Sequence, residues 1–128
     1  MVHMFLNGGG MADGPLHPML GGAPLVARTW SAPHYRFYAV RGEYPAMVRA
    51  ADGEEGHRVA GEVYDLPLDV LRDSLLPVEP AELELGVIEL DDGAPSLAMV
   101  LRKAYRGDPA LVDISELGSW RAYQDAHG

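Results

Sequence analysis

The sequence contains no cysteine among its 128 residues. This absence excludes disulfides, thiolate nucleophiles and cysteine-ligated zinc or iron–sulfur sites. Positive charge is also scarce: 10 Lys and Arg residues face 19 Asp and Glu residues, for a formal net charge of -9. A protein with this balance repels phosphate backbones and anionic lipid, so we expect neither nucleic acid nor a membrane as a partner.

Several further patterns are missing. No apolar run approaches the roughly 20 residues of a membrane-spanning helix, and the first residues lack the basic start and cleavage site of a secretory signal. We therefore expect a cytoplasmic protein. No two of the five histidines are spaced four residues apart, so no metal site is predicted and no cofactor is expected. There is also no Gly-x-Ser-x-Gly elbow and no phosphate-binding loop with its Lys-Ser/Thr pair.

The composition that is present is that of a folded domain. Apolar residues make up 48% and charged residues 23% of the chain, which is close to the globular average. The 15 glycines and 10 prolines are spread between short apolar runs, as turns between strands are. We expect one domain that spans residues 1–128.

Short apolar runs predict about six or seven strands. Val2 to Leu6 indicates a buried strand, and the runs at 25–30 and 35–40 indicate two neighbouring strands. The runs at 83–90 and 96–101 flank Asp91-Asp92-Gly93, which predicts a hairpin. Together with two helices, these strands predict an α+β fold, a small mixed β-barrel with flanking helices.

The two helices are predicted from local signals. Pro67 suits a first helical position, and Leu68, Leu71 and Leu75 follow at helical spacing. Near the end of the chain, Asp113 lies three residues before a glutamate, which is the spacing of a capping box. This spacing predicts a terminal helix over residues 114–126.

The first candidate site follows the first strand directly. Asn7 is followed by Gly8, Gly9 and Gly10, whose backbone amides no side chain obstructs. Such amides can form a concavity that binds a carboxylate or carbonyl oxygen. The alternative is an ordinary flexible turn.

Two titratable residues could move a proton there. His17 lies between this loop and Gly21-Gly22, where a short turn could present its imidazole as general acid or base. Glu79 lies between Val78 and Pro80, an apolar setting that could raise its pKa toward that of a general base. The alternatives are an exposed turn histidine and a solvated turn glutamate.

Recognition of an anionic substrate would fall to arginine, because the chain has only one lysine. Arg36 and Arg49 lie on or beside predicted strands and could pair with a substrate carboxylate if they point inward. The alternative for each is a surface arginine on a strand.

Several short motifs follow one another along nearly the whole chain. In order, they are Pro15-Leu16-His17-Pro18-Met19-Leu20, Arg28-Thr29-Trp30-Ser31-Ala32-Pro33-His34-Tyr35-Arg36-Phe37-Tyr38-Ala39, Gly61-Glu62-Val63-Tyr64, Gly86-Val87-Ile88-Glu89-Leu90-Asp91-Asp92-Gly93, and the closing Asp113-Ile114-Ser115 with Gly118 and Trp120-Arg121-Ala122-Tyr123. This order resembles the C-terminal domain of allophanate hydrolase. That domain belongs to the wider γ-glutamylcyclotransferase-like (AIG2-like) group, whose fold is a small barrel flanked by helices.

The resemblance implies an activity. In that family the domain accompanies an amidase domain and is associated with decarboxylation of the N-carboxycarbamate that the amidase releases. No amidase segment is present in these 128 residues. The cyclotransferase relatives carry Tyr-Gly-Ser-Asn-Leu where this chain reads Asn7-Gly8-Gly9-Gly10-Met11, and their catalytic glutamate follows the mid-chain helix near the place of Glu79.

Three hypotheses remain open. In the first, the chain is a lyase of urea degradation: a small anionic carbamate-like substrate binds the amides at 8–10 and an arginine, while His17 or Glu79 moves a proton. In the second, it is a γ-glutamylcyclotransferase with Glu79 as base. In the third, it is a non-catalytic module that docks on a separate amidase or pairs with itself as a homodimer.

Overall fold

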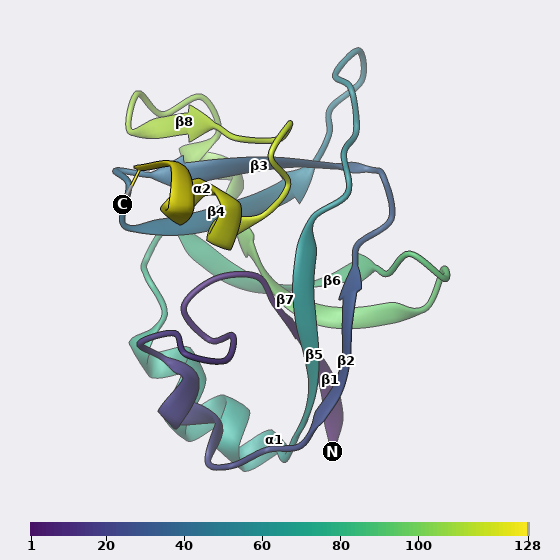
Figure 1. Cartoon of the computed structure of the whole chain (residues 1–128), viewed down its shortest axis with the longest axis vertical. Helices are drawn as coiled ribbons and strands as arrows, with labels where there is room; N and C mark the ends of the chain where they lie inside the picture. The colour runs from purple at the N-terminus through teal and green to yellow at the C-terminus, as the bar shows by residue number, and fades with distance from the viewer. Residues whose placement is uncertain (128) are drawn as a thin grey trace.

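The first strand, β1 (Val2–Leu6), lies in the middle of a five-stranded sheet (Figure 1). The order of this sheet is β2-β5-β1-β7-β6, and β1 runs antiparallel to β5 and parallel to β7. The other bounds are β2 (Leu25–Trp30), β5 (Ala60–Leu66), β6 (Leu83–Glu89) and β7 (Pro95–Leu101). Because both faces of β1 are covered, its last three residues are all buried and show no polar alternation.

Three more strands form a second sheet. They are β3 (Tyr35–Val40), β4 (Tyr44–Arg49) and β8 (Leu111–Asp113), in the antiparallel order β4-β3-β8. The computed structural model describes residues 1–127, and within them the predicted α+β class is confirmed. This described part of the chain has eight strands rather than six or seven, because the three-residue β8 is too short to give a pattern in the sequence.

The prediction that β2 and β3 are neighbours is wrong. β2 pairs with β5, whereas β3 belongs to the other sheet. Ser31, which is fully buried, follows the end of β2: its amide donates to Val59 O and its hydroxyl to Ala32 O. The chain passes at this point from one sheet to the other.

The hairpin prediction is confirmed. β6 and β7 pair antiparallel from Leu83 with Leu101 to Glu89 with Pro95. Gly93 has a φ of +87°, a conformation that glycine adopts without strain. The Asp92 carboxylate accepts a hydrogen bond from the Ala94 amide and closes the turn.

The first predicted helix is present but irregular, whereas the terminal helix is shorter than the sequence indicates. α1 (Leu68–Val70) continues as a π-helical turn over Leu71–Leu75 and a 3₁₀ turn over Leu76–Val78. The terminal helix α2 (Trp120–His127) starts later than the predicted residue 114. Gly118, with a φ of +61°, ends the preceding turn, and its amide and that of Leu117 both donate to Ile114 O.

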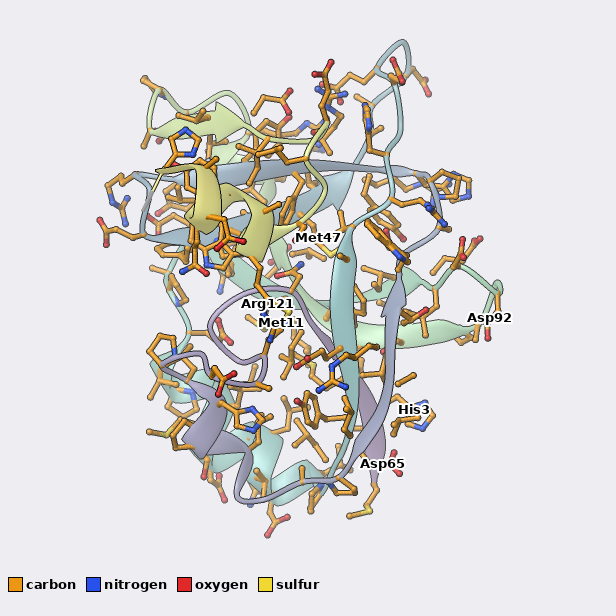
Figure 2. All side chains as sticks on the ribbon, in the orientation of Figure 1. His3, Met11, Met47, Asp65, Asp92 and Arg121 are labelled. Atoms are coloured by element: carbon orange, nitrogen blue, oxygen red, sulfur yellow. The ribbon has the colours of Figure 1, made fainter. Side chains whose placement is uncertain are left out.

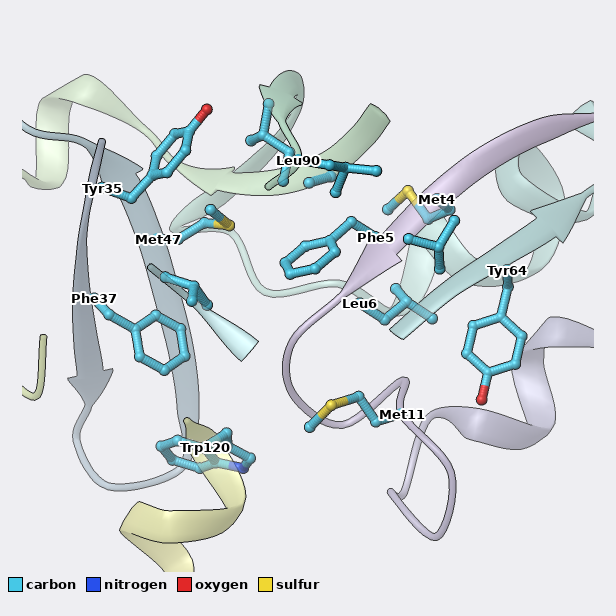
Figure 3. Packing of buried hydrophobic residues seen from close by; sticks show 14 of the residues in the cluster. Met4, Phe5, Leu6, Met11, Tyr35, Phe37, Met47, Tyr64, Leu90 and Trp120 are labelled. Atoms are coloured by element: carbon cyan, nitrogen blue, oxygen red, sulfur yellow. The ribbon is translucent and has the colours of Figure 1, made fainter. Parts of the chain in front are cut away.

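The core lies between the two sheets and α2 (Figure 3). Phe5 of β1 faces Phe37 and Met47 of the second sheet, and Trp120 at the start of α2 packs beside them. These four side chains are each at most 4% exposed. None of the helices in the described part of the chain is long and apolar enough to cross a membrane.

Candidate functional site

A cavity of about 260 Å³ lies beside the loop that follows β1. We call residues 7–14 the glycine loop and this space the glycine-loop cavity. The glycine loop forms one wall, the start of β4 and residues 78–83 form others, and α2 contributes Trp120 and Gln124. Figure 1 shows the loop as the purple coil in the middle of the molecule, between α2 and the α1 region.

The glycine loop is shaped by contacts that exclude larger residues. A Cβ on Gly8 would lie 2.6 Å from Pro45 Cγ, and one on Gly14 would lie 2.2 Å from Gly9 O. Two backbone hydrogen bonds close the loop, from the Met11 amide to Gly8 O at 3.1 Å and from the Leu16 amide to Gly9 O at 2.8 Å.

The loop amides are free to bind a ligand. Within residues 1–127, the amides of Gly8, Gly9 and Gly10 donate to no acceptor. These three glycines and Asn7 all line the cavity. Unpaired N–H groups beside a cavity favour a ligand oxygen that carries negative charge.

Glu79 lines the same cavity. It follows the 3₁₀ turn Leu76–Val78 in an extended conformation, and its amide donates to Leu76 O. Burial raises the pKa of its carboxyl to about 7. No donor among the described residues binds the carboxyl, so nothing near it compensates for the loss of water when it ionises.

His17 contacts the glycine loop but is not among the residues that line the cavity. Its Nδ1 is 3.0 Å from Gly10 O, so the tautomer with a proton on Nδ1 donates a hydrogen bond to the loop. The ring also packs edge to face on Tyr64, with a centroid distance of 5.5 Å. The contact that His17 makes thus holds the third glycine in position.

Arg36 and Arg49 lie away from the cavity. The guanidinium of Arg36 pairs with Asp113 of β8 and donates to Glu55 O. Arg49 is exposed at the end of β4. Because of the register of β3 and β4, neither arginine side chain lies beside the glycine loop.

Sequence reasoning missed a buried carboxylate beside the loop. Glu62 of β5 is 1% exposed, and its Oε1 accepts hydrogen bonds from the Ala12 amide and the Tyr64 hydroxyl, each at 2.8 Å. Its Oε2 lies 3.2 Å from Arg28 Nε and 3.5 Å from Arg121 Nη2. The signal in the sequence was that Glu62 stands between Gly61 and Val63, within the part of β5 that is otherwise apolar.

The environment of Glu62 keeps it ionised. Burial opposes the charge, but the hydrogen bonds from Ala12, Tyr64 and Arg28 and the charge of Arg121 hold the pKa of Glu62 below its usual value. Burial, together with the bond to Glu62, raises the pKa of Tyr64 to about 12. Glu62 therefore joins β5 to the glycine loop, β2 and α2.

A second polar group lies at the rim of the cavity. Tyr44 lines the cavity, and its hydroxyl accepts a hydrogen bond from Arg41 Nη2 at 3.2 Å. Arg41 also donates to Glu82 at 2.8 Å. Hydrogen bonds from Tyr44 and Arg41 lower the pKa of Glu82 to about 2, so this carboxylate stays charged while Glu79 titrates.

Within the described residues, no group of three or more His, Asp or Glu side chains could hold a metal ion. The cavity instead offers backbone amides, one titratable carboxyl and an apolar wall that includes Phe5, Leu83 and Met99. This combination suits proton transfer to a small anion held by main-chain hydrogen bonds.

Comparison with known proteins identifies the family. The model of the allophanate hydrolase C-terminal domain matches residues 2–125. The chain therefore belongs to the allophanate hydrolase C-terminal domain family, as the sequence motifs predict. A uropathogenic E. coli-specific protein of solved structure is 32% identical, with a TM-score of 0.86 over 97% of this chain and 95% of that one. No curated protein matches the chain.

Two further structures place the fold more widely. Kluyveromyces lactis allophanate hydrolase is 24% identical, with a TM-score of 0.88, and the match covers 99% of this chain but only 21% of that one. An AIG2-like protein from Mus musculus is 19% identical, with a TM-score of 0.56 over 86% of this chain and 82% of that one. The fold is thus that of the allophanate hydrolase domain, with a more distant similarity to AIG2-like proteins.

Proposed function

We propose that this chain is a lyase that removes CO₂ from a small anionic carbamate-like molecule of the N-carboxycarbamate type. The observation that carries the proposal is that Glu79, with its pKa raised to about 7, shares one partly apolar cavity with the unpaired amides at 8–10. Family membership supports it, because the matching domain is part of allophanate hydrolase in Kluyveromyces lactis.

The reaction needs a proton but no nucleophile. In N-carboxycarbamate, one nitrogen carries two carboxylates. Loss of CO₂ breaks one C–N bond, and its electron pair stays on the nitrogen, which takes the proton of the Glu79 carboxyl. The products are CO₂ and carbamate, and Glu79 recovers its proton from water. A carboxyl with a pKa near 7 is half protonated at neutral pH and can serve as this acid.

The remaining groups bind and orient the substrate. The amides at 8–10 hold the carboxylate that is retained, with Asn7 beside them. The departing carboxylate faces the apolar wall, where loss of its charge is favoured. His17 acts as a positioning residue through its bond to Gly10 O rather than by touching the substrate. Arg36 and Arg49 have no part in this binding mode.

One alternative uses the same carboxyl in the opposite protonation state. As a base, ionised Glu79 would take a proton from an amine that attacks a γ-glutamyl carbonyl, whose oxygen would lie on the loop amides. The observation in its favour is again the presence of Glu79 in the glycine-loop cavity. The two functions differ in substrate and in the direction of their pH dependence.

The test is a turnover assay with a matched control. N-carboxycarbamate is generated in place by an amidase that acts on allophanate, and CO₂ release is followed with and without this chain. We expect the wild-type chain to accelerate release, Glu79→Gln to lose about 100-fold or more of the acceleration, and Glu84→Gln to retain it. Glu84 is an exposed carboxylate of β6 that pairs with Arg102, so it controls for the change of charge.

Other outcomes would overturn the proposal. Equal rates of CO₂ release for wild type and Glu79→Gln would show that Glu79 has no part in the reaction. Turnover of γ-glutamyl amines in place of the carbamate would favour the cyclotransferase. If neither substrate reacts and the chain binds the amidase or itself, it is a non-catalytic module.

A further inference from the structure

A second cavity lies beside Met11 of the glycine loop. It has a volume of about 220 Å³, is open to solvent, and is lined by β2, the start of β5, Met11 and the residues around the start of α2. Its polar lining includes Arg28, Thr29, Ser119 and Arg121. Figure 2 labels Arg121 and Met11, which lie close together where α2 meets the loop. We call this space the arginine cavity.

The charges in the arginine cavity do not balance. Arg28 and Arg121 both pair with the one carboxylate of Glu62, which leaves one positive charge in excess. The Ala12 amide and the Tyr64 hydroxyl bind Oε1 of Glu62, so the two guanidinium groups share Oε2 and most of their N–H groups are left without this carboxylate as an acceptor. In a chain of net charge -9, an excess of positive charge in a cavity is a local exception.

Arg28 presents unused donors. Only its Nε binds Glu62, and its two Nη atoms donate to no acceptor within residues 1–127. The side chain is 66% exposed, so this end of the guanidinium is accessible from solvent. Two parallel N–H groups of this kind bind a carboxylate or phosphate in bidentate fashion.

An aromatic ring and a third cation lie beside it. Trp30 lines the cavity and is 38% exposed. The guanidinium of Arg58 lies 4.9 Å from the centroid of this ring, and its own partner, Asp91, is 3.5 Å away. The indole supplies an apolar surface for the body of a ligand whose charged end lies on Arg28.

We propose that the arginine cavity is a second binding site, for a small molecule that carries an oxyanion group. The volume limits the ligand to a small metabolite, and the fork of Arg28 with the excess positive charge selects the oxyanion. Carboxylate and phosphate ligands share this chemistry. The site is separate from Glu79 and does not depend on the proposed lyase activity.

The two tryptophans allow the two cavities to be distinguished. Trp30 lines the arginine cavity, whereas Trp120 lines the glycine-loop cavity. The full chain is titrated with malonate and, separately, with inorganic phosphate while the two indole N–H resonances are followed by NMR. We expect a saturable shift of the Trp30 resonance with at least one probe. The probe that causes the shift also shows whether the site binds a carboxylate or a phosphate.

Variants of Arg28 complete the test. Arg28→Ala should weaken binding about tenfold or more, and Arg28→Lys, which keeps a charge beside Glu62, should also weaken it because lysine lacks the fork. Arg72→Ala removes an exposed arginine that pairs with Asp73 and should bind like the wild type. The proposal is overturned if neither probe binds, if Trp120 shifts instead of Trp30, or if both Arg28 variants bind with unchanged affinity.

Discussion

At the scale of single residues, Glu79 combines an apolar setting with a position beside free amides. Its neighbours in the sequence, Val78 and Pro80, indicated that its pKa could be raised, with a solvated turn residue as the alternative, and the structure favours the first. The cause is burial alone, because no described side chain binds the carboxyl. A group of this kind destabilises the fold when it is ionised, and that cost can be measured.

The stability of the protein should depend on pH through Glu79. An ordinary glutamate has a pKa near 4.5, and burial raises that of Glu79 to about 7. Between these pH values the unfolded chain loses this proton while the folded chain keeps it, so the free energy of unfolding falls as pH rises. We expect Glu79 to contribute a fall of about 1–3 kcal/mol across this range, measured by urea denaturation.

The matched variants isolate this contribution. The glutamine in Glu79→Gln cannot ionise, so the fall in the free energy of unfolding that Glu79 causes should disappear. At pH values above the pKa of Glu79, the variant should be more stable than the wild type. Glu84→Gln should keep the wild-type profile, because Glu84 is exposed. If the stability of Glu79→Gln depends on pH as that of the wild type does, burial does not raise the pKa of the Glu79 carboxyl.

Other residues could not be placed from sequence in the same way. The side chains of Arg36 and Arg49 are directed by strand register, which depends on partners distant in the chain such as β8. Glu62 gave only the weak signal of an acid among apolar neighbours in β5, because its donors come from residues 12, 28, 64 and 121. Long-range contacts of this kind leave no local pattern.

At the scale of elements, the glycine loop determines the shape of the cavity. Gly8 packs on Pro45 at the start of β4, where a Cβ would lie 2.6 Å from the proline ring. A Cβ on Gly9 would lie 3.4 Å from the Pro15 ring, which is an ordinary contact. The two neighbouring glycines thus differ in what they tolerate.

This difference predicts opposite results for two alanine variants. Gly8→Ala should push the loop away from β4, lower stability by about 1–3 kcal/mol and abolish turnover. Gly9→Ala should stay within about 1 kcal/mol of the wild type, because its methyl group fits. Thermal unfolding and the CO₂-release assay measure both effects. Equal losses of stability and of turnover in Gly8→Ala and Gly9→Ala would contradict this account of the loop.

Elements that depend on neighbours in sequence were predicted best. The hairpin around Gly93 was predicted correctly because its turn residues carry the signal. The terminal helix was predicted six residues too early, because the capping spacing at Asp113 instead serves a turn that ends at Gly118. The passage between sheets at Ser31 rests on a contact with Val59 that no local pattern reveals.

At the scale of the whole molecule, the two sheets and α2 enclose a core from which the glycine loop extends. Glu62 binds the loop through Ala12, and Arg121 donates to Ala12 O at 2.8 Å. Residue 12 is therefore held from both β5 and α2, while His17 holds Gly10. The fold thus holds the loop at residues 10 and 12, while Gly8, Gly9 and Gly10 line the glycine-loop cavity.

The central claim is that Glu79 donates a proton to a carbamate-like substrate, and the pH dependence of the rate tests it most directly. CO₂ release is measured at saturating substrate from about pH 5 to about pH 9 for the wild type and Glu79→Gln. We predict a rate that is constant at low pH and falls about tenfold per unit above a pKa near 7, and a low rate without this transition in the variant. A rate that rises through pH 7, or a transition that persists in Glu79→Gln, would contradict the account.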